Sequence, residues 1–567
     1  MKHFFLCLAI FTIGCSSQIN TTGDQSTTSN RGVIGDSAMV STAHPLASQI
    51  GKEILKKGGN AFDAAIAIQF TLAVVYPVAG NIGGGGFAVF RTKDGQTGAI
   101  DFREKAPALA NKDMYLDSNK NVIPKLSTEG HLAAGVPGSV DGMFKLHEKY
   151  GSLPMEELIQ PAIDFAFNGV KLYEIDVENI NKYQEVFKKF DSGHNYYIKE
   201  TPWKAGDVIY HKELAGTLSF IRDFGRDGFY KGIVANQIVA EMNRGNGYIT
   251  KEDLANYSAK WRKPLIGNYR GYEVISMPPP SSGGIALLQL LSGAETFDIG
   301  KSGHNTAKTI HLMTELERRV YSDRATHLAD PDYYDVPVEM LLSKSYNEKR
   351  FSDIEKNKAT PSEKIKEGRV DVIESMETTH FSVVDKDGNA ISITTTINGY
   401  FGCKVMVKGA GFFLNNEMDD FSAKPGVPNM FGLVGAEANA IAPEKRMLSS
   451  MTPTILTKDG KLAMVVGTPG GSTIITSVFQ TILNVVDHHM TMKEAVSAPR
   501  VHHQWLPNRV LYESGTLPEK TLSQLEKMGH KMEERDAYGK MDCILVLPDG
   551  RLEGASDPRN YGTAEGY

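Results

Sequence analysis

Two adjacent threonines, Thr378 and Thr379, have the most unusual chemical option in this chain. They follow a charged segment, and residues 379–384 alternate in the way that predicts a half-buried strand. If the chain were cut before Thr378, its hydroxyl and its new α-amino group would lie on one residue. An α-amino group titrates near about pH 7.7–8 and could serve as the base for that hydroxyl. Paired threonines more often reflect β-propensity alone, so other parts of the chain must show whether Thr378 is a catalytic residue.

A second chemical feature is Gly470-Gly471, which joins a predicted strand at 463–467 to a predicted apolar helix at 473–486. Backbone N–H groups at the positive end of a helix suit an anion, including the oxyanion of an acyl-transfer intermediate. A tight turn is the alternative, and by itself the dipeptide favours the turn. The chain has no Gly-x-Ser-x-Gly motif, which weakens a serine-hydrolase interpretation.

Charged and metal-binding side chains give weaker signals. Arg103 follows a predicted strand at 99–102, where an arginine is usually exposed or in a structural ion pair, although its planar fork also suits a substrate carboxylate. The histidine pairs at 488–489 and 502–503 predict no metal site. Neighbouring residues point to different faces of a helix or strand, and no Cys or carboxylate is spaced to complete a set of ligands.

Length and composition set broad limits. A chain of 567 residues is too long for one ordinary core, so two large units or one large layered unit are expected. A net charge of -6 and the lack of a dense Lys/Arg run give no indication of nucleic-acid binding. The glycine-rich segment 80–87 follows a predicted helix and precedes a strand, the reverse of a nucleotide-binding loop, and it lacks the Gly-Lys-Ser/Thr ending. This segment is therefore not predicted to bind a nucleotide phosphate.

The first residues form a targeting segment. Basic residues precede a short apolar run at 4–11, which is too short to span a bilayer and predicts a signal peptide over 1–15. Gly14-Cys15 resembles a bacterial lipobox, although Thr12 departs from the usual Leu, so lipidation of Cys15 and simple cleavage both stay open. Mass spectrometry of the mature N-terminus would distinguish them. Residues 16–31 predict a polar tether. A periplasmic or secreted location follows, with a lipid anchor as one form of it.

The predicted secondary structure of the remaining chain changes from mainly helical to mainly strand at Thr378. Two helices are predicted near 45–57 and 60–75, and the segment 137–372 is mainly helical in pattern. Residues 355–371 are rich in Lys and Glu and predict an exposed loop shortly upstream of Thr378, where a cut could occur. After Thr378, strands predominate, with hairpin turns at 386–388, 458–460 and 548–550. Cys403 and Cys543 are too few for a disulfide framework, and two unpaired thiols are the simpler prediction.

Six short motifs are specific in combination: residues 101–104 (DFRE), 278–284 (PPPSSGG), 378–385 (TTHFSVVD), 414–421 (LNNEMDDF), 448–451 (LSSM) and 469–472 (PGGS). Together these segments resemble the γ-glutamyltransferase family (glutathione hydrolase proenzymes) of N-terminal-nucleophile hydrolases. The resemblance runs from about Gly32 to Tyr567 and implies an α+β fold, a four-layer αββα sandwich of the N-terminal-nucleophile hydrolase type. It also implies self-cleavage between Glu377 and Thr378, giving a large subunit (32–377) and a small catalytic subunit (378–567).

The resemblance assigns a role to each site residue. Thr378 is the nucleophile, Thr396 orients and activates it, and the N–H groups of Gly470 and Gly471 hold the oxyanion. A γ-glutamyl group carries both an α-carboxylate and an α-ammonium, so a selective site must bind both charged groups. The side chains that bind the carboxylate are Arg103, Ser449 and Ser450, and those that bind the ammonium are Asn398, Glu417 and Asp420.

The reaction implied is attack on the γ-amide of glutathione or another γ-glutamyl compound, after which water, an amino acid or a dipeptide resolves the γ-glutamyl ester. The resemblance implies that this reaction needs no metal or organic cofactor. Two positions depart from many members: Phe431 stands in the lid loop 425–435 where many have Tyr, and Glu417 where some have Gln. A related acylase acting on β-lactam side chains is the nearest rival, and an unprocessed secreted binding protein of the same fold is a second one. The full set of charge-binding residues, with Thr378 and Thr396, favours the γ-glutamyl reaction.

Overall fold

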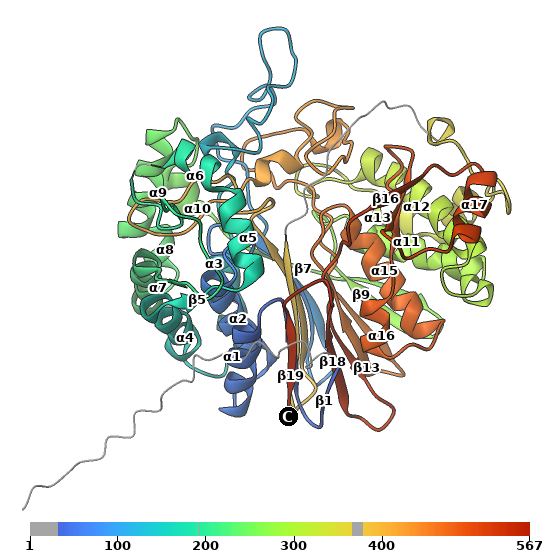
Figure 1. Cartoon of the computed structure of the whole chain (residues 1–567), viewed down its shortest axis with the longest axis horizontal. Helices are drawn as coiled ribbons and strands as arrows, with labels where there is room; N and C mark the ends of the chain where they lie inside the picture. The colour runs from blue at the N-terminus through green and yellow to red at the C-terminus, as the bar shows by residue number, and fades with distance from the viewer. Residues whose placement is uncertain (1–31, 192, 366–377) are drawn as a thin grey trace, which may run out of the picture.

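Two seven-stranded antiparallel sheets lie face to face in the computed structural model, which describes residues 32–191, 193–365 and 378–567. The helices of the N-terminal half of the chain cover the outer face of one sheet, and the later helices cover the outer face of the other (Figure 1). The chain therefore forms four layers in the order helix, sheet, sheet, helix, which confirms the predicted αββα architecture.

The α-helices have the following bounds: α1 (Pro45–Lys56), α2 (Ala61–Val75), α3 (Ser139–Tyr150), α4 (Met155–Asn168), α5 (Glu174–Lys182), α6 (Gln184–Phe190), α7 (Lys212–Phe224), α8 (Asp227–Tyr230), α9 (Gly232–Arg244), α10 (Lys251–Asn256), α11 (Gly283–Thr296), α12 (Ala307–His327), α13 (Val338–Leu342), α14 (Lys344–Phe351), α15 (Thr473–Val486), α16 (Met492–Ser497) and α17 (Glu519–Lys527).

The strands have the following bounds: β1 (Val33–Gly35), β2 (Met39–Thr42), β3 (Gly85–Arg91), β4 (Thr97–Asp101), β5 (Val170–Lys171), β6 (Val208–Ile209), β7 (Lys260–Arg262), β8 (Leu265–Tyr269), β9 (Tyr272–Ser276), β10 (Thr379–Val384), β11 (Ala390–Thr396), β12 (Thr454–Lys458), β13 (Lys461–Val466), β14 (Val501–His502), β15 (Val510–Glu513), β16 (Met532–Arg535), β17 (Asp542–Val546), β18 (Leu552–Ser556) and β19 (Thr563–Gly566).

Each sheet contains strands from both sides of the predicted cleavage point. One sheet has the order β19-β2-β10-β11-β3-β4-β7, and the other has the order β1-β18-β17-β13-β12-β9-β8. In the first sheet, β10 pairs with β2 on one side and with β11 on the other. A cut before Thr378 would therefore leave two chains joined by the hydrogen bonds of both sheets and by a shared core, because neither segment forms a complete sheet alone.

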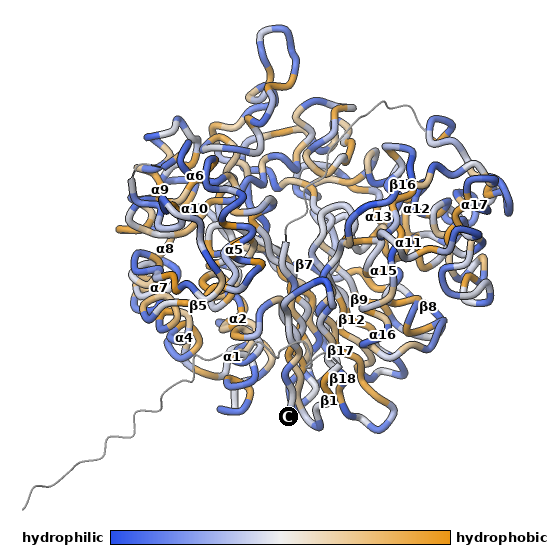
Figure 2. Tube along the Cα trace, viewed as in Figure 1, coloured by the Kyte–Doolittle hydropathy of each residue, from blue (hydrophilic) through white to orange (hydrophobic). Residues whose placement is uncertain are grey.

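Helix α2 shows how the sequence determines these layers. Every one of its residues is buried, as its continuous apolar run predicts, and Asn60 caps it with bonds to the N–H groups of Phe62 and Asp63. It packs on β10 and β11. Figure 2 shows hydrophobic residues concentrated along the strands and on the inner sides of the helices.

Most predicted elements agree with the structure, and the three predicted hairpin turns after Thr378 join β10 to β11, β12 to β13 and β17 to β18. The edge strands β7 and β8 were not predicted. Both strands are short and mostly exposed or partly buried, and they contain several polar side chains, so the sequence lacks a clear strand pattern there. Cys403 and Cys543 are buried free thiols, as expected.

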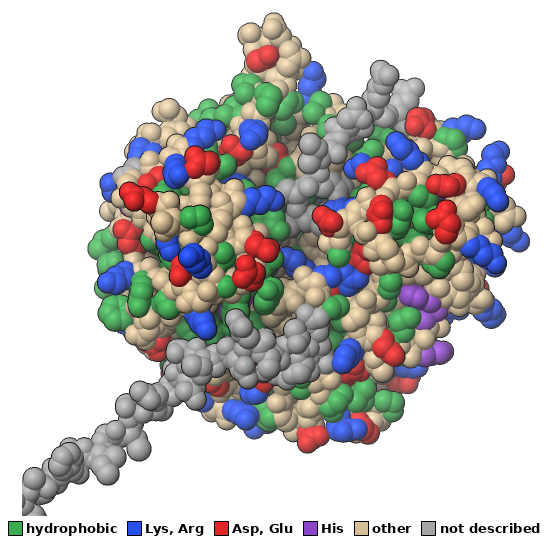
Figure 3. All heavy atoms as spheres, viewed as in Figure 1, with side chains coloured by type: hydrophobic (Ala, Val, Ile, Leu, Met, Phe, Trp, Pro, Cys, Tyr) green, Lys and Arg blue, Asp and Glu red, His purple; other side chains and the backbone are tan. Residues whose placement is uncertain are grey.

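The exposed surface carries charges of both signs. Figure 3 shows Lys and Arg interspersed with Asp and Glu over the face in view, in keeping with the small net charge. In the part of the chain that the structure describes, no helix is both long and apolar enough to cross a bilayer. Of the segment at 355–371, residues 366–371 fall outside the described ranges, as do the signal segment and Glu377.

Candidate active site

The register of two strands brings Thr378 opposite Thr396. Thr379 at the start of β10 pairs with Thr395 of β11, so the residue before one faces the residue after the other. The Oγ1 of Thr378 donates to the Oγ1 of Thr396 at 3.4 Å, and the backbone N–H of Asn398 donates to that same Thr396 oxygen at 2.7 Å. Both threonines are buried, with 5% and 2% of their surface exposed. The predicted nucleophile therefore has a neighbouring hydroxyl that can orient it.

A pocket of about 290 Å³ opens around Thr378. It contains most of the residues that the sequence assigned to the site, although they come from segments far apart in the chain. Gly470 is not among its lining residues, and Glu377 lies outside the described ranges. The predicted site residues that line the pocket are Arg103, Thr378, Thr396, Asn398, Glu417, Asp420, Ser449, Ser450 and Gly471.

Arg103 forms the centre of an ion-pair cluster at this pocket. Its guanidinium contacts Glu417 and lies 2.5 Å from the Oδ2 of Asp420, and both acids belong to the short 3-10 helix Glu417–Asp420. The Oε2 of Glu417 is buried and has no hydrogen-bond partner among the described residues. The side chains assigned to a carboxylate and to an ammonium thus lie side by side, and one acidic oxygen remains available as an acceptor.

Burial controls the electrostatics of this cluster. Burial alone would lower the pKa of Arg103, but Glu417, Asp420 and Glu104 outweigh that effect and raise it. The same burial raises the pKa of Glu417 well above its usual range, with Arg103 opposing the shift and Glu104 adding to it. The Oε2 of Glu104 lies 3.6 Å from the Nη1 of Arg103, and both carboxylate oxygens of Glu104 are buried without a hydrogen-bond partner among the described residues. Three acids therefore compete for one guanidinium.

This cluster predicts a pH effect on stability. Burial raises the pKa of Glu104, which faces Arg103, Asp420, Asp101 and Glu417. A raised folded-state pKa means that the folded protein keeps a proton which an unfolded glutamate, with a pKa near about 4.3, has already lost, so stability falls as the pH rises above that value.

We expect Glu104→Gln to make this fall shallower by up to about 1.4 kcal/mol per pH unit, as measured by unfolding between about pH 5 and 7. Parallel curves for the two proteins would contradict the assignment.

The polar side chains around the cluster are held by the backbone. The Nδ2 of Asn398 donates to the carbonyl of Asn416 at 3.0 Å, which leaves its Oδ1 as an acceptor. Asn398 has a φ of 71°, a left-handed conformation that asparagine tolerates better than most residues. Ser449 accepts a bond from the N–H of Met451 at 3.2 Å. These bonds preorganise the amide and the serine pair before any substrate binds.

Gly471 and Phe431 close one side of the pocket. Gly470 and Gly471 have φ values of 139° and 54° and immediately precede α15. A Cβ on Gly471 would lie 2.5 Å from the Phe431 ring, so only glycine permits this approach. Phe431 is anchored through its backbone, since its carbonyl accepts from Gln504 at 3.1 Å and its N–H donates to Asn429 at 3.0 Å. The lid residue therefore packs by its ring, without the hydroxyl that Tyr would supply.

The pocket also contains residues that sequence reasoning missed. Arg324 of α12 lines it beside Ser450, and Leu433, Met451 and Ile474 contribute apolar walls. The helix that carries Arg324 contains many charged residues, and such a pattern predicts a solvated face. Its burial on nearly every side depends on packing between distant segments, so no local signal could have identified it.

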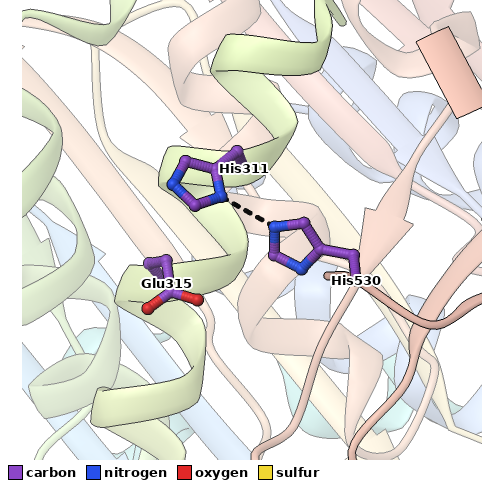
Figure 4. A group of neighbouring side chains, drawn as sticks. All are labelled: His311, Glu315 and His530. Carbon is purple, nitrogen blue, oxygen red and sulfur yellow. Dashed lines mark hydrogen bonds between the residues drawn. The ribbon is translucent and has the colours of Figure 1, made fainter. Parts of the chain in front are cut away.

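One group of potential metal ligands occurs elsewhere in the described ranges, formed by His311, Glu315 and His530 (Figure 4). His311 Nδ1 lies 2.7 Å from His530 Nε2, and its Nε2 lies 2.8 Å from the carbonyl of Glu355. Glu315 accepts from Arg319 at 2.7 Å and from the N–H of Thr360 at 3.0 Å. These contacts form a hydrogen-bonded core with arginine already neutralising the carboxylate, so we assign the cluster a structural role.

Comparison with known proteins places this fold and site in context. The family described as Gamma-glutamyltranspeptidase matches residues 47–567. The Glutathione hydrolase proenzyme of Escherichia coli (strain K12) is 48% identical over 524 residues, which cover 92% of this chain and 90% of that protein. The Acylase ACY 1 proenzyme of Pseudomonas sp. (strain SE83) is 36% identical over 538 residues and 93% of each chain. A crystal structure of cephalosporin acylase from Bacillus halodurans matches with a TM-score of 0.82 and 28% identity, over 94% of this chain and 97% of that one.

These matches extend over both predicted subunits and agree with the four-layer fold. They also include both of the activities that the sequence left in competition, so the pocket must distinguish them. The chain belongs to the gamma-glutamyltranspeptidase family.

Proposed function

We propose that Thr378 is the residue through which this chain carries out its family's reaction. The protein is a self-processing glutathione hydrolase and γ-glutamyltranspeptidase proenzyme, as the family and its relatives show. Cleavage before Thr378 yields the large and small subunits and creates the α-amino group that serves as the base. The role of each residue in the pocket is the part that we infer from its geometry.

The reaction proceeds in two acyl transfers. The Oγ1 of Thr378 attacks the γ-carbonyl carbon of the donor while the α-amino group takes the hydroxyl proton. Thr396 holds the attacking oxygen, and the N–H groups of Gly470 and Gly471 stabilise the negative oxygen of the tetrahedral intermediate. The C–N bond then breaks, and the amine leaves with the proton, as cysteinylglycine when glutathione is the donor. Water, an amino acid or a dipeptide attacks the γ-glutamyl ester and restores Thr378.

One observation carries this proposal: the pocket that contains Thr378 also contains groups of both charges, placed for a zwitterion. Arg103 and the two serines suit the α-carboxylate, whereas Glu417, Asp420 and Asn398 suit the α-ammonium. An acylase for β-lactam side chains shares the nucleophile but has no need for both charge sets. The γ-glutamyl reaction therefore explains more of the pocket than the acylase reaction does.

The test is an assay with γ-glutamyl-p-nitroanilide, with and without glycylglycine as acceptor. A β-lactam side-chain amide is assayed in parallel as the rival donor. We expect γ-glutamyl-p-nitroanilide to release p-nitroaniline without acceptor and to release it faster when glycylglycine is present. Turnover of the β-lactam donor alone would overturn the assignment. The ratio of hydrolysis to transfer comes from the same experiment.

Export is a further part of the proposal, supported by the apolar run at 4–11 and by Gly14-Cys15. We propose a periplasmic or secreted enzyme, with a lipid anchor on Cys15 as one form. Mature protein that still begins at Met1 would contradict export.

A further inference from the structure

Arg324 is a second buried cation that lines the same pocket as Arg103. It comes from α12, has 5% of its surface exposed, and lines the same pocket as Thr378. Its Nε donates to the Oγ of Ser282 at 2.9 Å, and its Nη2 donates to the Oγ of Ser450 at 3.1 Å. Both of its hydrogen-bond partners are thus neutral hydroxyls.

The other buried arginines of α12 are neutralised differently. Arg319 lies 2.7 Å from Glu315, and Arg318 lies 3.4 Å from that same acid. Within the described ranges, Arg324 has no carboxylate within the 4.0 Å of an ion pair. Burial lowers its pKa to about 10, an effect that Asp420 opposes and Arg103 increases, so it remains charged at neutral pH. Keeping a buried cation without an acidic partner is costly, and an anionic ligand would remove that cost.

The serine hydroxyls next to Arg324 are arranged as donors. Ser450 accepts from Arg324, and Ser449 accepts from the N–H of Met451. Ser282, which Arg324 also holds, donates to the carbonyl of Ser449 at 2.6 Å. A hydroxyl has one O–H to give, and among the described residues neither Ser449 nor Ser450 donates to a protein acceptor through its side chain. Arg324 therefore holds the serine pair with its O–H groups available to an anion.

We propose that Arg324 is the second cation of the α-carboxylate subsite, where it positions Ser450 directly and Ser449 through Ser282 and so selects donors that carry an α-carboxylate. This inference rests on the proposed function, because it concerns how the γ-glutamyl group is recognised.

The charge balance of the pocket supports this assignment. Glu104, Glu417 and Asp420 surround Arg103, so that guanidinium alone faces an excess of acid. A donor carboxylate that enters beside these acids would be repelled unless a second cation were available to it. Arg324 supplies that charge at the serines, where its hydrogen-bond partners among the described residues are the hydroxyls of Ser282 and Ser450.

The experiment compares two donors in the processed enzyme: γ-glutamyl-p-nitroanilide and 4-aminobutanoyl-p-nitroanilide, which is the same donor without its α-carboxylate. For Arg324→Gln we expect KM for the first donor to rise about tenfold or more, as loss of a charged hydrogen bond predicts. We expect kcat/KM for the second donor to change less than about twofold. The KM of Arg324→Lys for the first donor should lie between those of wild type and Arg324→Gln, because lysine keeps the positive charge but lacks the planar guanidinium.

Arg319→Gln is the matched control, since Arg319 is also buried on the same helix but does not line the pocket. It should lower the unfolding temperature and leave KM for both donors unchanged. Equal losses for both donors in Arg324→Gln, or an unchanged KM for the first, would overturn the proposal. If Arg324→Gln does not fold and self-cleave, Arg324→Lys tests the proposal instead. Its ratio of kcat/KM for the carboxylate-bearing donor to kcat/KM for the second donor must then fall below that of wild type. A wild-type enzyme that turns over neither donor would refute the proposed function instead.

Discussion

Replacing Thr378 with Ala is expected to leave the chain uncleaved and inactive. Wild type should migrate as two chains, with the smaller one beginning at Thr378, whereas Thr378→Ala should migrate as one. Loss of turnover on the order of 10⁴-fold or more is expected, because the variant lacks both the nucleophile and the α-amino base that cleavage creates. Thr378→Ser keeps a hydroxyl and should still cleave.

Thr379 offers the matched control for this experiment. Among the described residues, its buried Oγ1 has no hydrogen-bond partner, and Thr379 directly follows Thr378 at the start of β10. Thr379→Val removes only that unpaired hydroxyl, so it should cleave and turn over normally. Mass spectrometry of a quenched reaction should place the γ-glutamyl group on Thr378. Cleavage in Thr378→Ala, or loss of cleavage in Thr379→Val alone, would show that the wrong threonine has been assigned.

Replacing Arg103 with Gln is expected to give the second largest effect. Arg103 is fully buried in the pocket, and its planar guanidinium can bind a carboxylate through two parallel bonds. Losing charged hydrogen bonds costs about 1.5–3 kcal/mol each, and about 1.4 kcal/mol corresponds to a factor of ten, so KM for γ-glutamyl-p-nitroanilide should rise about 10²-fold. The effect on kcat should be smaller, because the carboxylate is remote from the reacting carbonyl.

Arg446→Gln controls for the loss of a buried arginine near this site. Arg446 contacts Asp101 at 3.2 Å and the carbonyl of Ser258 at 2.9 Å, and it does not line the pocket. It should reduce the unfolding temperature and leave KM unchanged. Self-cleavage of Arg103→Gln shows that the variant folds. An unchanged KM in folded, cleaved Arg103→Gln would remove Arg103 from the carboxylate subsite.

The local elements of this fold were predictable from the sequence. Helix α2 and its Asn60 cap, α15, and the hairpins around β10–β13 and β17–β18 follow from hydrophobic periodicity and turn residues, which act over a few positions. The edge strands β7 and β8 were not, because partly exposed strands depend on pairing with distant partners.

The candidate site likewise has one part that the sequence predicted and another that depends on the tertiary structure. By itself, the sequence determined a chemically plausible nucleophile at Thr378. Its resemblance to the γ-glutamyltransferase family then predicted residues for an oxyanion, a carboxylate and an ammonium. Only the tertiary structure decided that these residues, apart from Gly470, line one pocket, that Glu417 and Asp420 pair with Arg103, and that Arg324 lies beside the serines. Those facts depend on the register between β10 and β11 and on the packing of α12 over distant loops. Such long-range contacts leave no periodic trace in any single segment, whereas a threonine's chemistry is present wherever the residue occurs.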